Sequence, residues 1–229
     1  GEKIALVGLN GAGKTTIIKL LCGFYKPESG RILLNGQDIR NFKKEDLYAL
    51  IAPVFQEATI LPFTVAQNVA MSDENVDRKR VEESLKQVGL WEAVSRLPLG
   101  MDNGMTSLEE GGSSFSGGQK QKLHMARALY KGAQLLFFDE PTAALDPIAE
   151  SETYEMFHSL SGNKTAVYIS HRLASTLFCS RVVFLENGRV KACGPHEELM
   201  KTCGEYREMY DLQSQYYKKT DAADDGVFA

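Results

Sequence analysis

The chain has 229 residues, enough for one large domain with a sizeable core. Its formal net charge of −4 argues against nucleic acid as the main partner, because binding along a phosphate backbone requires clustered Lys and Arg. The four cysteines form no C-x-x-C pair, which argues against a zinc or redox site. No apolar run approaches the roughly 18 residues that span a bilayer, so we expect any membrane role to depend on a partner or on polypeptide outside this sequence.

The first predicted element is a strand over residues 3–7, whose short apolar run is typical of a strand buried on both faces. Residues 8–15 follow at once as Gly-Leu-Asn-Gly-Ala-Gly-Lys-Thr. Residues 15–22 then have the apolar spacing of a helix, which Gly23 is expected to end. A complete G-x-x-x-x-G-K-T match between a strand and a helix predicts a phosphate-binding loop and disfavours a glycine-rich turn that binds nothing.

The chemistry of such a loop depends on its backbone. Glycines let the chain wrap closely around phosphates, and the N–H groups at the start of the following helix point at the anion. Lys14 would supply a positive charge to the β- and γ-phosphates of ATP, and Thr15 would offer a hydroxyl to Mg²⁺. The residues expected to bind the nucleotide here are Gly8, Asn10, Gly11, Ala12, Gly13, Lys14, Thr15 and Thr16.

The middle of the chain changes from strand-like patterns to helical ones. Residues 31–34 are predicted to form a strand, and the pair Asn35-Gly36 favours a tight turn after it. From about residue 57 to residue 131 strand-like runs are few, so we predict a helical insertion. The apolar residues at helical spacing that support it are Val81, Leu85 and Val88.

Strands and helices alternate again after the insertion. Buried strands are predicted over residues 135–138, 166–170 and 181–185, with helices between them, for example near residues 148–160. The pair Asn187-Gly188 is a second tight-turn signal. This alternation predicts a mostly parallel sheet covered on both sides.

The end of the chain is predicted to be helical from residue 197 to about residue 219. This segment carries four tyrosines: Tyr206, Tyr210, Tyr216 and Tyr217. Residues 220–229 are polar and acidic, and we expect them to be disordered.

Two acidic residues follow the apolar run at residues 135–138. Asp139 ends the predicted strand, so its carboxylate would emerge at the carboxyl edge of the sheet, where ligands sit in open α/β folds. It fits the role of holding Mg²⁺ through water. Glu140 is placed to orient or deprotonate an attacking water. The phosphate loop elsewhere in the sequence disfavours the alternative, two solvated acids at the end of a strand.

A second glycine-rich loop, Ser116-Gly117-Gly118-Gln119, precedes a segment with helical periodicity. Ser followed three residues later by Gln is a capping box, which satisfies the N–H groups at the start of a helix. A capping box does not require two glycines, however, and these would let a phosphate approach the backbone. The structural and the functional interpretation are compatible.

Together these motifs resemble the nucleotide-binding domain of an ATP-binding cassette (ABC) transporter, and the resemblance covers nearly the whole chain. In that family the loop at residues 115–119 is the signature, and it faces the γ-phosphate held by the other protomer. Phe115 stands where the family usually has Leu. The resemblance implies that Ser116, Gly118 and Gln119 close over the ATP of a second domain.

The resemblance also implies roles for residues that carry little signal alone. Gln56 matches the Q-loop glutamine, which reaches Mg²⁺ and the attacking water, although a lone Gln is far more often a surface residue. His171 matches the switch histidine at the γ-phosphate, although a lone His is usually structural. Asp146 matches the D-loop at the dimer interface. Glu110 matches the acid of the exporter X-loop, which contacts the coupling helices of the membrane domain; an exposed acidic loop is the alternative.

These roles imply a catalytic and a metal-binding set. The catalytic residues would be Glu140, His171, Gln56 and Lys14, and the Mg²⁺ ligands would be Thr15, Gln56 and Asp139. The family's adenine-stacking aromatic residue lies upstream of the first strand, outside this sequence.

The predicted fold is an α/β P-loop NTPase (RecA-like) core with a mostly parallel sheet, an inserted α-helical subdomain and an incomplete antiparallel β subdomain. We predict one ABC ATPase domain over residues 1–229. Its core would comprise residues 1–56 and 132–219, its helical subdomain with the signature residues 57–131, and its disordered tail residues 220–229.

The implied function is ATP hydrolysis with Mg²⁺ that drives a membrane exporter. The partners would be a second ABC ATPase domain, in a homo- or heterodimer, and a transmembrane domain, at the cytoplasmic face of a membrane. A soluble ABC ATPase acting on DNA or the ribosome is the first alternative, and a non-catalytic half of a heterodimer is the second. No heptad run separates the two motifs and no basic surface is evident, which disfavours the first. Glu140 and His171 are both present, which disfavours the second.

Overall fold

The computed structural model describes residues 1–55, 59–105, 115–140, 147–169 and 173–224. The chain forms two compact units, which are described separately. The first comprises Gly1 and Ile18–Ala166, and the second comprises Glu2–Ile17 and Val167–Ala229. This division does not follow the predicted boundaries at residues 56/57 and 131/132, which stay a prediction.

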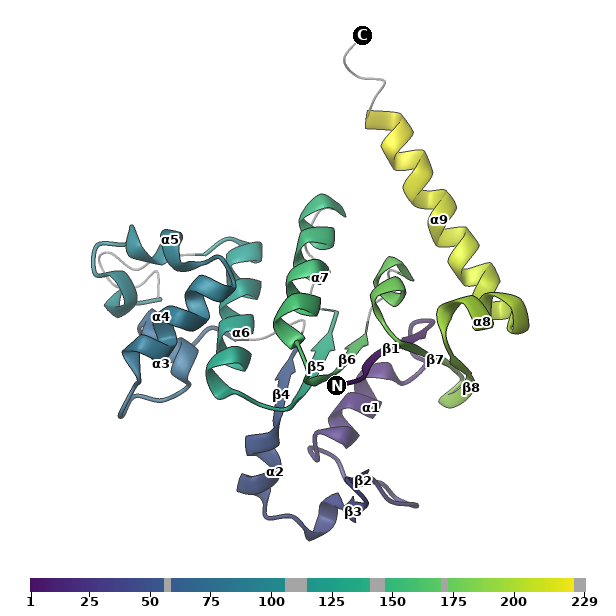
Figure 1. The fold of residues 1–229 in the computed structure, drawn as a ribbon, viewed down its shortest axis with the longest axis horizontal. Coiled ribbons are helices and arrows are strands. Elements are labelled where there is room, and N and C mark those ends of the chain that lie inside the picture. Colours follow the sequence, from purple (N-terminus) through teal and green to yellow (C-terminus); the bar gives the residue numbers. More distant parts are fainter. Residues whose placement is uncertain (56–58, 106–114, 141–146, 170–172, 225–229) are drawn as a thin grey trace. The chain divides into compact units, whose positions relative to one another are not determined.

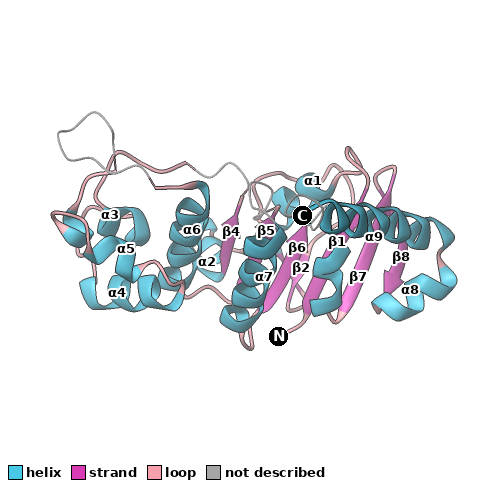
Figure 2. Ribbon diagram, turned by 90° about the horizontal axis from the view of Figure 1, so that it is seen from above, coloured by secondary structure: helices cyan, strands magenta, loops and turns pink. Residues whose placement is uncertain are grey.

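Four helices of the first unit form a helical group, in the part of the chain predicted to be a helical insertion. They are α3 (Val65–Ala70), α4 (Arg78–Gln87), α5 (Trp91–Ser95) and α6 (Gly117–Lys131). Figure 2 shows them side by side, with α6 packed against α3 and α4. Apolar side chains fill much of their interface: Val81, Leu85 and Val88, predicted from helical spacing, are all buried, as are Val65 and Leu123.

Two parallel strands of the first unit are β4 (Ile51–Val54) and β5 (Leu135–Asp139). The strand β5 confirms the prediction over residues 135–138. The helix α7 (Pro147–Ser161) confirms the helix predicted near residues 148–160. Phe157 of α7 stacks on Phe138 of β5, with ring centroids 4.8 Å apart, and both side chains are fully buried.

A small antiparallel pair precedes the helix α2 (Lys44–Leu50) in the first unit. It consists of β2 (Leu33–Leu34) and β3 (Gln37–Asp38), so the strand predicted over residues 31–34 is only two residues long. The predicted turn is confirmed, because Asn35 (φ 49°) and Gly36 (φ 82°) both adopt the left-handed conformation that a two-residue hairpin requires. A short helical turn, η1 (Ile39–Asn41), and α2 follow. A second such turn, η2 (Gly100–Asp102), lies after α5.

The second unit contains the strand order β6-β1-β7-β8. These strands are β1 (Lys3–Gly8), β6 (Thr165–Ile169, which begins in the first unit), β7 (Arg181–Glu186) and β8 (Arg189–Gly194). The strand β1 pairs with β7 in parallel, and β7 and β8 are antiparallel. The predicted turn between them is confirmed by Asn187 (φ 50°) and Gly188 (φ 74°).

Helices flank these strands in the second unit (Figure 1). They are α1 (Lys14–Leu21, which ends in the first unit), η3 (Leu173–Phe178), α8 (His196–Thr202) and α9 (Gly204–Asp224). The helix α9 runs away from the strands beyond its start. Tyr206 of α9 is fully buried and packs with Leu199, Val7 and Phe184 in one apolar cluster. This cluster fixes the start of α9 on β1 and β7.

The end of the chain differs from its prediction in two respects. The single helix expected over residues 197–219 is two helices, because Cys203 adopts an extended conformation (φ −122°, ψ 102°) between α8 and α9. The helix α9 also continues to Asp224, so residues 220–224 are helical rather than disordered. Polarity and charge indicated disorder, but Ala222 and Ala223 are strong helix formers that favour continuing an existing helix. Residues 225–229 lie outside the described part.

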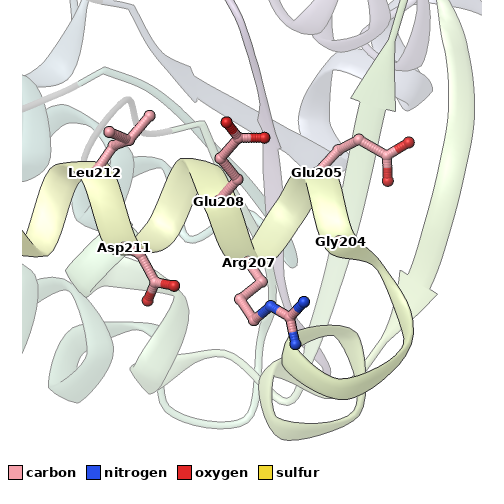
Figure 3. Close-up of a pocket in the computed structure, with 6 residues that line it drawn as sticks. All are labelled: Gly204, Glu205, Arg207, Glu208, Asp211 and Leu212. Carbon is pink, nitrogen blue, oxygen red and sulfur yellow. The ribbon is translucent and has the colours of Figure 1, made fainter.

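The helix α9 carries charges on its exposed surface around a hollow of about 560 Å³. Glu205, Glu208 and Leu212 lie along one side of the helix, and Arg207 and Asp211 along the other (Figure 3). Lys191 of β8 forms ion pairs with Glu205 and Glu186, both at 3.0 Å. Within the residues that the structure describes, none of the helices combines the length and apolar character that crossing a bilayer demands.

Candidate nucleotide-binding site

The phosphate loop connects β1 to α1 in the second unit. Gly8 ends β1 where a Cβ atom would overlap the carbonyl oxygen of Leu185 on β7, so only glycine fits there. Inside the loop, the Ala12 N–H donates to the Leu9 carbonyl at 3.1 Å, which closes a tight turn. The predicted strand–loop–helix order is therefore confirmed.

Two further glycines give the loop its curvature. Gly11 and Gly13 have φ angles of 78° and 98°, which side chains other than glycine rarely adopt. No described atom lies within 4 Å of the position that a Cβ atom would take at either residue. The backbone of the loop therefore has open space beside it.

Lys14 lies at the centre of the loop. Its Nζ donates to the carbonyls of Gly8 at 2.9 Å and Leu9 at 3.1 Å, and the residue is only 6% exposed. The ammonium thus lies at the start of α1, where the positive end of the helix dipole favours an anion. Thr15, half-buried, and Thr16, exposed, lie in the same first turn of α1. The loop gathers the predicted residues around one positively charged helix start.

The two acidic residues lie in the first unit, at the carboxyl end of β5. Asp139 is the last residue of that strand and is 6% exposed. Glu140 follows with φ 50°, a left-handed conformation that costs a residue with a side chain roughly 1 kcal/mol or more. This backbone turns Glu140 out of the line of the strand. Strained residues of this kind cluster at functional sites.

The signature loop begins α6 in the first unit. The Ser116 hydroxyl accepts from the Gln119 N–H at 3.3 Å, and the Ser116 N–H donates to Gln119 Oε1 at 3.0 Å, so the predicted capping box is confirmed. Gly117 and Gly118 form the first turn, where N–H groups have no acceptor within the helix. Phe115 is buried just before it.

Four residues that the resemblance assigns lie outside the described part of the chain. They are Gln56, Glu110, Asp146 and His171. Their roles stay predictions.

The structure also contains a buried polar network that sequence analysis missed. Asn68 of α3 has no exposed surface and accepts a hydrogen bond from Arg127 of α6 at 2.7 Å. Its only sequence signal was a polar residue among the apolar residues of a helix face. Arg127 and His124 also line a cavity of about 540 Å³ in the first unit, together with Phe55 and Met71.

Comparison with known proteins gives consistent matches. The family model described as ABC transporter matches residues 1–143. The chain is 40% identical over 216 residues to the ATP-dependent lipid A-core flippase of Cupriavidus pinatubonensis, covering 93% of the chain and 36% of that protein. It is 39% identical over 216 residues to the mitochondrial iron-sulfur clusters transporter ATM1 of Saccharomyces cerevisiae, covering 93% of the chain and 31% of that protein. The chain thus spans about a third of the length of these relatives.

A solved structure gives the same result for the fold. The structure of a bacterial Atm1-family ABC exporter with ATP bound matches with a TM-score of 0.83 and 34% identity, over 93% of this chain and 37% of that chain. This confirms the predicted α/β P-loop fold, with a mostly parallel sheet and a small antiparallel sheet. The chain belongs to the ABC transporter family.

Proposed function

We propose that this chain binds and hydrolyses ATP with Mg²⁺ and thereby drives a conformational change in a membrane exporter. It would act at the cytoplasmic face of the membrane, as one half of a head-to-tail pair of ATPase domains. The observation that carries this proposal is the buried Lys14 ammonium, held by two carbonyls at the start of α1. The names of the relatives, a lipid A-core flippase and an iron-sulfur clusters transporter, support the exporter part.

Phosphate binding follows from the loop. The N–H groups of Gly11 and of residues 13–16, with the Lys14 ammonium, would surround the β- and γ-phosphates of ATP, and Asn10 at the exposed tip would extend this cradle. A phosphate that occupies the open space beside Gly11 and Gly13 would be held mainly by backbone groups. Binding would therefore depend on loop conformation more than on side-chain identity at the glycines.

The available oxygens suit Mg²⁺. Thr15 offers a hydroxyl and Asp139 a carboxylate, which are hard donors of the kind that Mg²⁺ takes alongside phosphate and water; Gln56 would add an amide oxygen. When bound, Mg²⁺ neutralises charge on the β- and γ-phosphate oxygens. The protein itself would keep these oxygen donors in fixed positions.

Hydrolysis would then be a matter of positioning and charge. Glu140, whose backbone is left-handed at φ 50°, would orient or deprotonate the attacking water. His171 and Gln56 would contact the γ-phosphate and the water. The start of α6, with Ser116, Gly118 and Gln119, would close over the γ-phosphate of the partner domain. Asp146 would lie at that dimer interface.

Coupling to transport would involve Glu110, which would contact the transmembrane domain. That domain belongs to the same polypeptide or to a partner chain, and the second ATPase domain is an identical or a related one. The transported substrate would bind in the transmembrane domain.

The decisive test uses Glu140→Gln, which removes the catalytic carboxylate but keeps its size. We expect this variant to bind Mg-ATP, to lose turnover and to double in mass by light scattering when Mg-ATP is added. The matched control is Glu155→Gln, the same change at an exposed residue of α7, which should hydrolyse ATP at the parent rate. Parent-rate hydrolysis by Glu140→Gln would refute the catalytic assignment, and an unchanged mass would refute the ATP-induced dimer.

A further inference from the structure

The guanidinium of Arg127, a half-buried residue, is the centre of a polar network in the first unit. Its Nε donates to the Asn68 carbonyl at 2.8 Å and its Nη2 to Asn68 Oδ1 at 2.7 Å. Its Nη1 donates to the Thr59 carbonyl at 2.9 Å and lies 3.1 Å from His124 Nδ1. Three nitrogens of one planar group are thus engaged at once, which the rigid fork of an arginine permits and a lysine ammonium does not.

The oxygens that accept from Arg127 belong to the uncharged groups of Thr59 and Asn68. Burial lowers the pKa of Arg127, but a guanidinium starts so high that it keeps its charge. Arg127 is half-buried, so its charge is partly removed from water, and removing one of the carbonyl or amide oxygens that accept from it leaves that charge less compensated. The network therefore favours one arrangement of the segments that it joins.

Asn68 extends the network to the segment that precedes α3. Its Nδ2 donates to the carbonyls of Leu61, Phe63 and Thr64 at 3.0, 3.3 and 3.1 Å. Its Oδ1 also accepts from the Leu61 N–H at 3.0 Å. One fully buried side chain therefore fixes the backbone of residues 61–64, while Arg127 holds Thr59.

The segment fixed in this way is residues 59–64, which we call the Q-exit segment because it begins three residues after Gln56. The other end of the network is α6, whose first turn is the signature loop at Ser116. The Q-exit segment and α6 are far apart in sequence, since Asn68 and Arg127 are 59 residues apart. Their connection is thus a product of the fold.

We propose that Arg127 and Asn68 are positioning residues that lock the Q-exit segment to α6. The signature loop would then keep a fixed position relative to the segment that leaves Gln56. The inference rests on the proposed function, because it matters only if Gln56 contacts one nucleotide and Ser116 the nucleotide of the partner. A displacement at either site would be passed to the other through this network.

The test substitutes Arg127→Lys in the Glu140→Gln background of this chain. The matched control is Arg78→Lys, the same change at an exposed arginine of α4, where the partner is Asp102 at 2.7 Å. Amide hydrogen exchange measures residues 59–68 and 115–124 without nucleotide. Light scattering measures the dissociation constant of the Mg-ATP dimer, and a fluorescent ATP analogue measures binding to the monomer.

We expect Arg127→Lys to speed exchange in both segments and to weaken the dimer by about tenfold, with monomer binding unchanged. The control should match its parent in all three measurements. Unchanged exchange in residues 59–68 would overturn the proposal. Faster exchange with a dimer constant within about twofold of the parent would also overturn it, because the network would then be only structural. If the Glu140→Gln parent itself forms no dimer, the proposed function fails, and the exchange data still decide whether the lock exists.

Discussion

The two glycine-rich helix starts of this molecule look alike in sequence but differ in physical character. At α1, Gly11 and Gly13 take left-handed φ angles and a buried Lys14 ammonium lies inside the turn. At α6, Gly117 has no such angle, and Ser116 and Gln119 close the turn with their own hydrogen bonds. The first start holds an ammonium within a curved loop, whereas the second is closed by the hydrogen bonds of its own capping box. Glycine content alone therefore does not distinguish a strong phosphate site from a weak one.

The difference between the starts of α1 and α6 suits their proposed roles, binding ATP within the domain and contacting the ATP of the partner domain. A charged, wrapped loop would bind ATP by itself, because several N–H groups and an ammonium converge. A capped, neutral start offers the Ser116 hydroxyl and the N–H groups of Gly117 and Gly118, which would add little affinity until a partner presents a bound phosphate. The comparison therefore predicts that nucleotide binding precedes pairing.

Lys14→Ala should cause the largest loss of activity. It removes the ammonium at the start of α1 and the hydrogen bonds to the Gly8 and Leu9 carbonyls, so we expect ATP hydrolysis to fall by at least about a hundredfold. Fluorescent nucleotide binding and phosphate release measure the effect. The control is Lys19→Ala in the last turn of the same helix, which should retain parent activity. Parent-like binding by Lys14→Ala would remove the contrast between the two helix starts.

Ser116→Ala should have an effect of intermediate size, and it should weaken dimer formation rather than nucleotide binding. Losing the cap costs about 1 kcal/mol of stability, and losing the hydroxyl should weaken the Mg-ATP dimer by roughly tenfold in the Glu140→Gln background. Binding of ATP to the monomer should not change, because the α1 loop is untouched. Equal loss of monomer binding would mean that the signature loop acts within its own protomer.

Two glycine substitutions should have the smallest effects, and they should change the free energy of unfolding in opposite directions. Gly13→Ala places a side chain at φ 98° and should destabilise the fold by roughly 1–2 kcal/mol. Gly117→Ala enters open space at an ordinary helical position and should stabilise it by about 0.4–1 kcal/mol. Urea unfolding without nucleotide compares them. If both substitutions changed the free energy of unfolding in the same direction, Gly13 and Gly117 would not differ in backbone requirement.

Much of the site was predictable because its signals are local. The loop at residues 8–15, the capping box at Ser116 and the two Asn-Gly turns each specify a backbone shape within a few residues. The strand β4 was missed because Pro53 interrupts its apolar run and removes a backbone donor. The strand β8 was missed because most of its residues are exposed, so it shows no apolar pattern.

The long-range parts of the fold had no such local signal. Nothing near Asn68 in the sequence specifies that Arg127 will reach it, because that contact depends on how α3 and α6 pack. The break between α8 and α9 at Cys203 also depends on packing between elements. The extended backbone there lets Leu199 and Tyr206 enter one apolar cluster. The sequence pattern within a helix or strand predicts that element, whereas contacts such as the one between Asn68 and Arg127 depend on how the elements pack.

The pairing of β1 with β7 has a consequence for synthesis on the ribosome. The Lys3 N–H donates to the Ser180 hydroxyl across 177 residues of sequence, so β1 leaves the ribosome long before its neighbour exists. At about 5–20 residues per second, the nascent strand waits on the order of 10–35 s with its apolar side chains exposed. The phosphate loop follows β1 directly and waits with it. During that interval the emerging polypeptide needs protection from aggregation, and the proposed ATP site would form only after β7 has been synthesised.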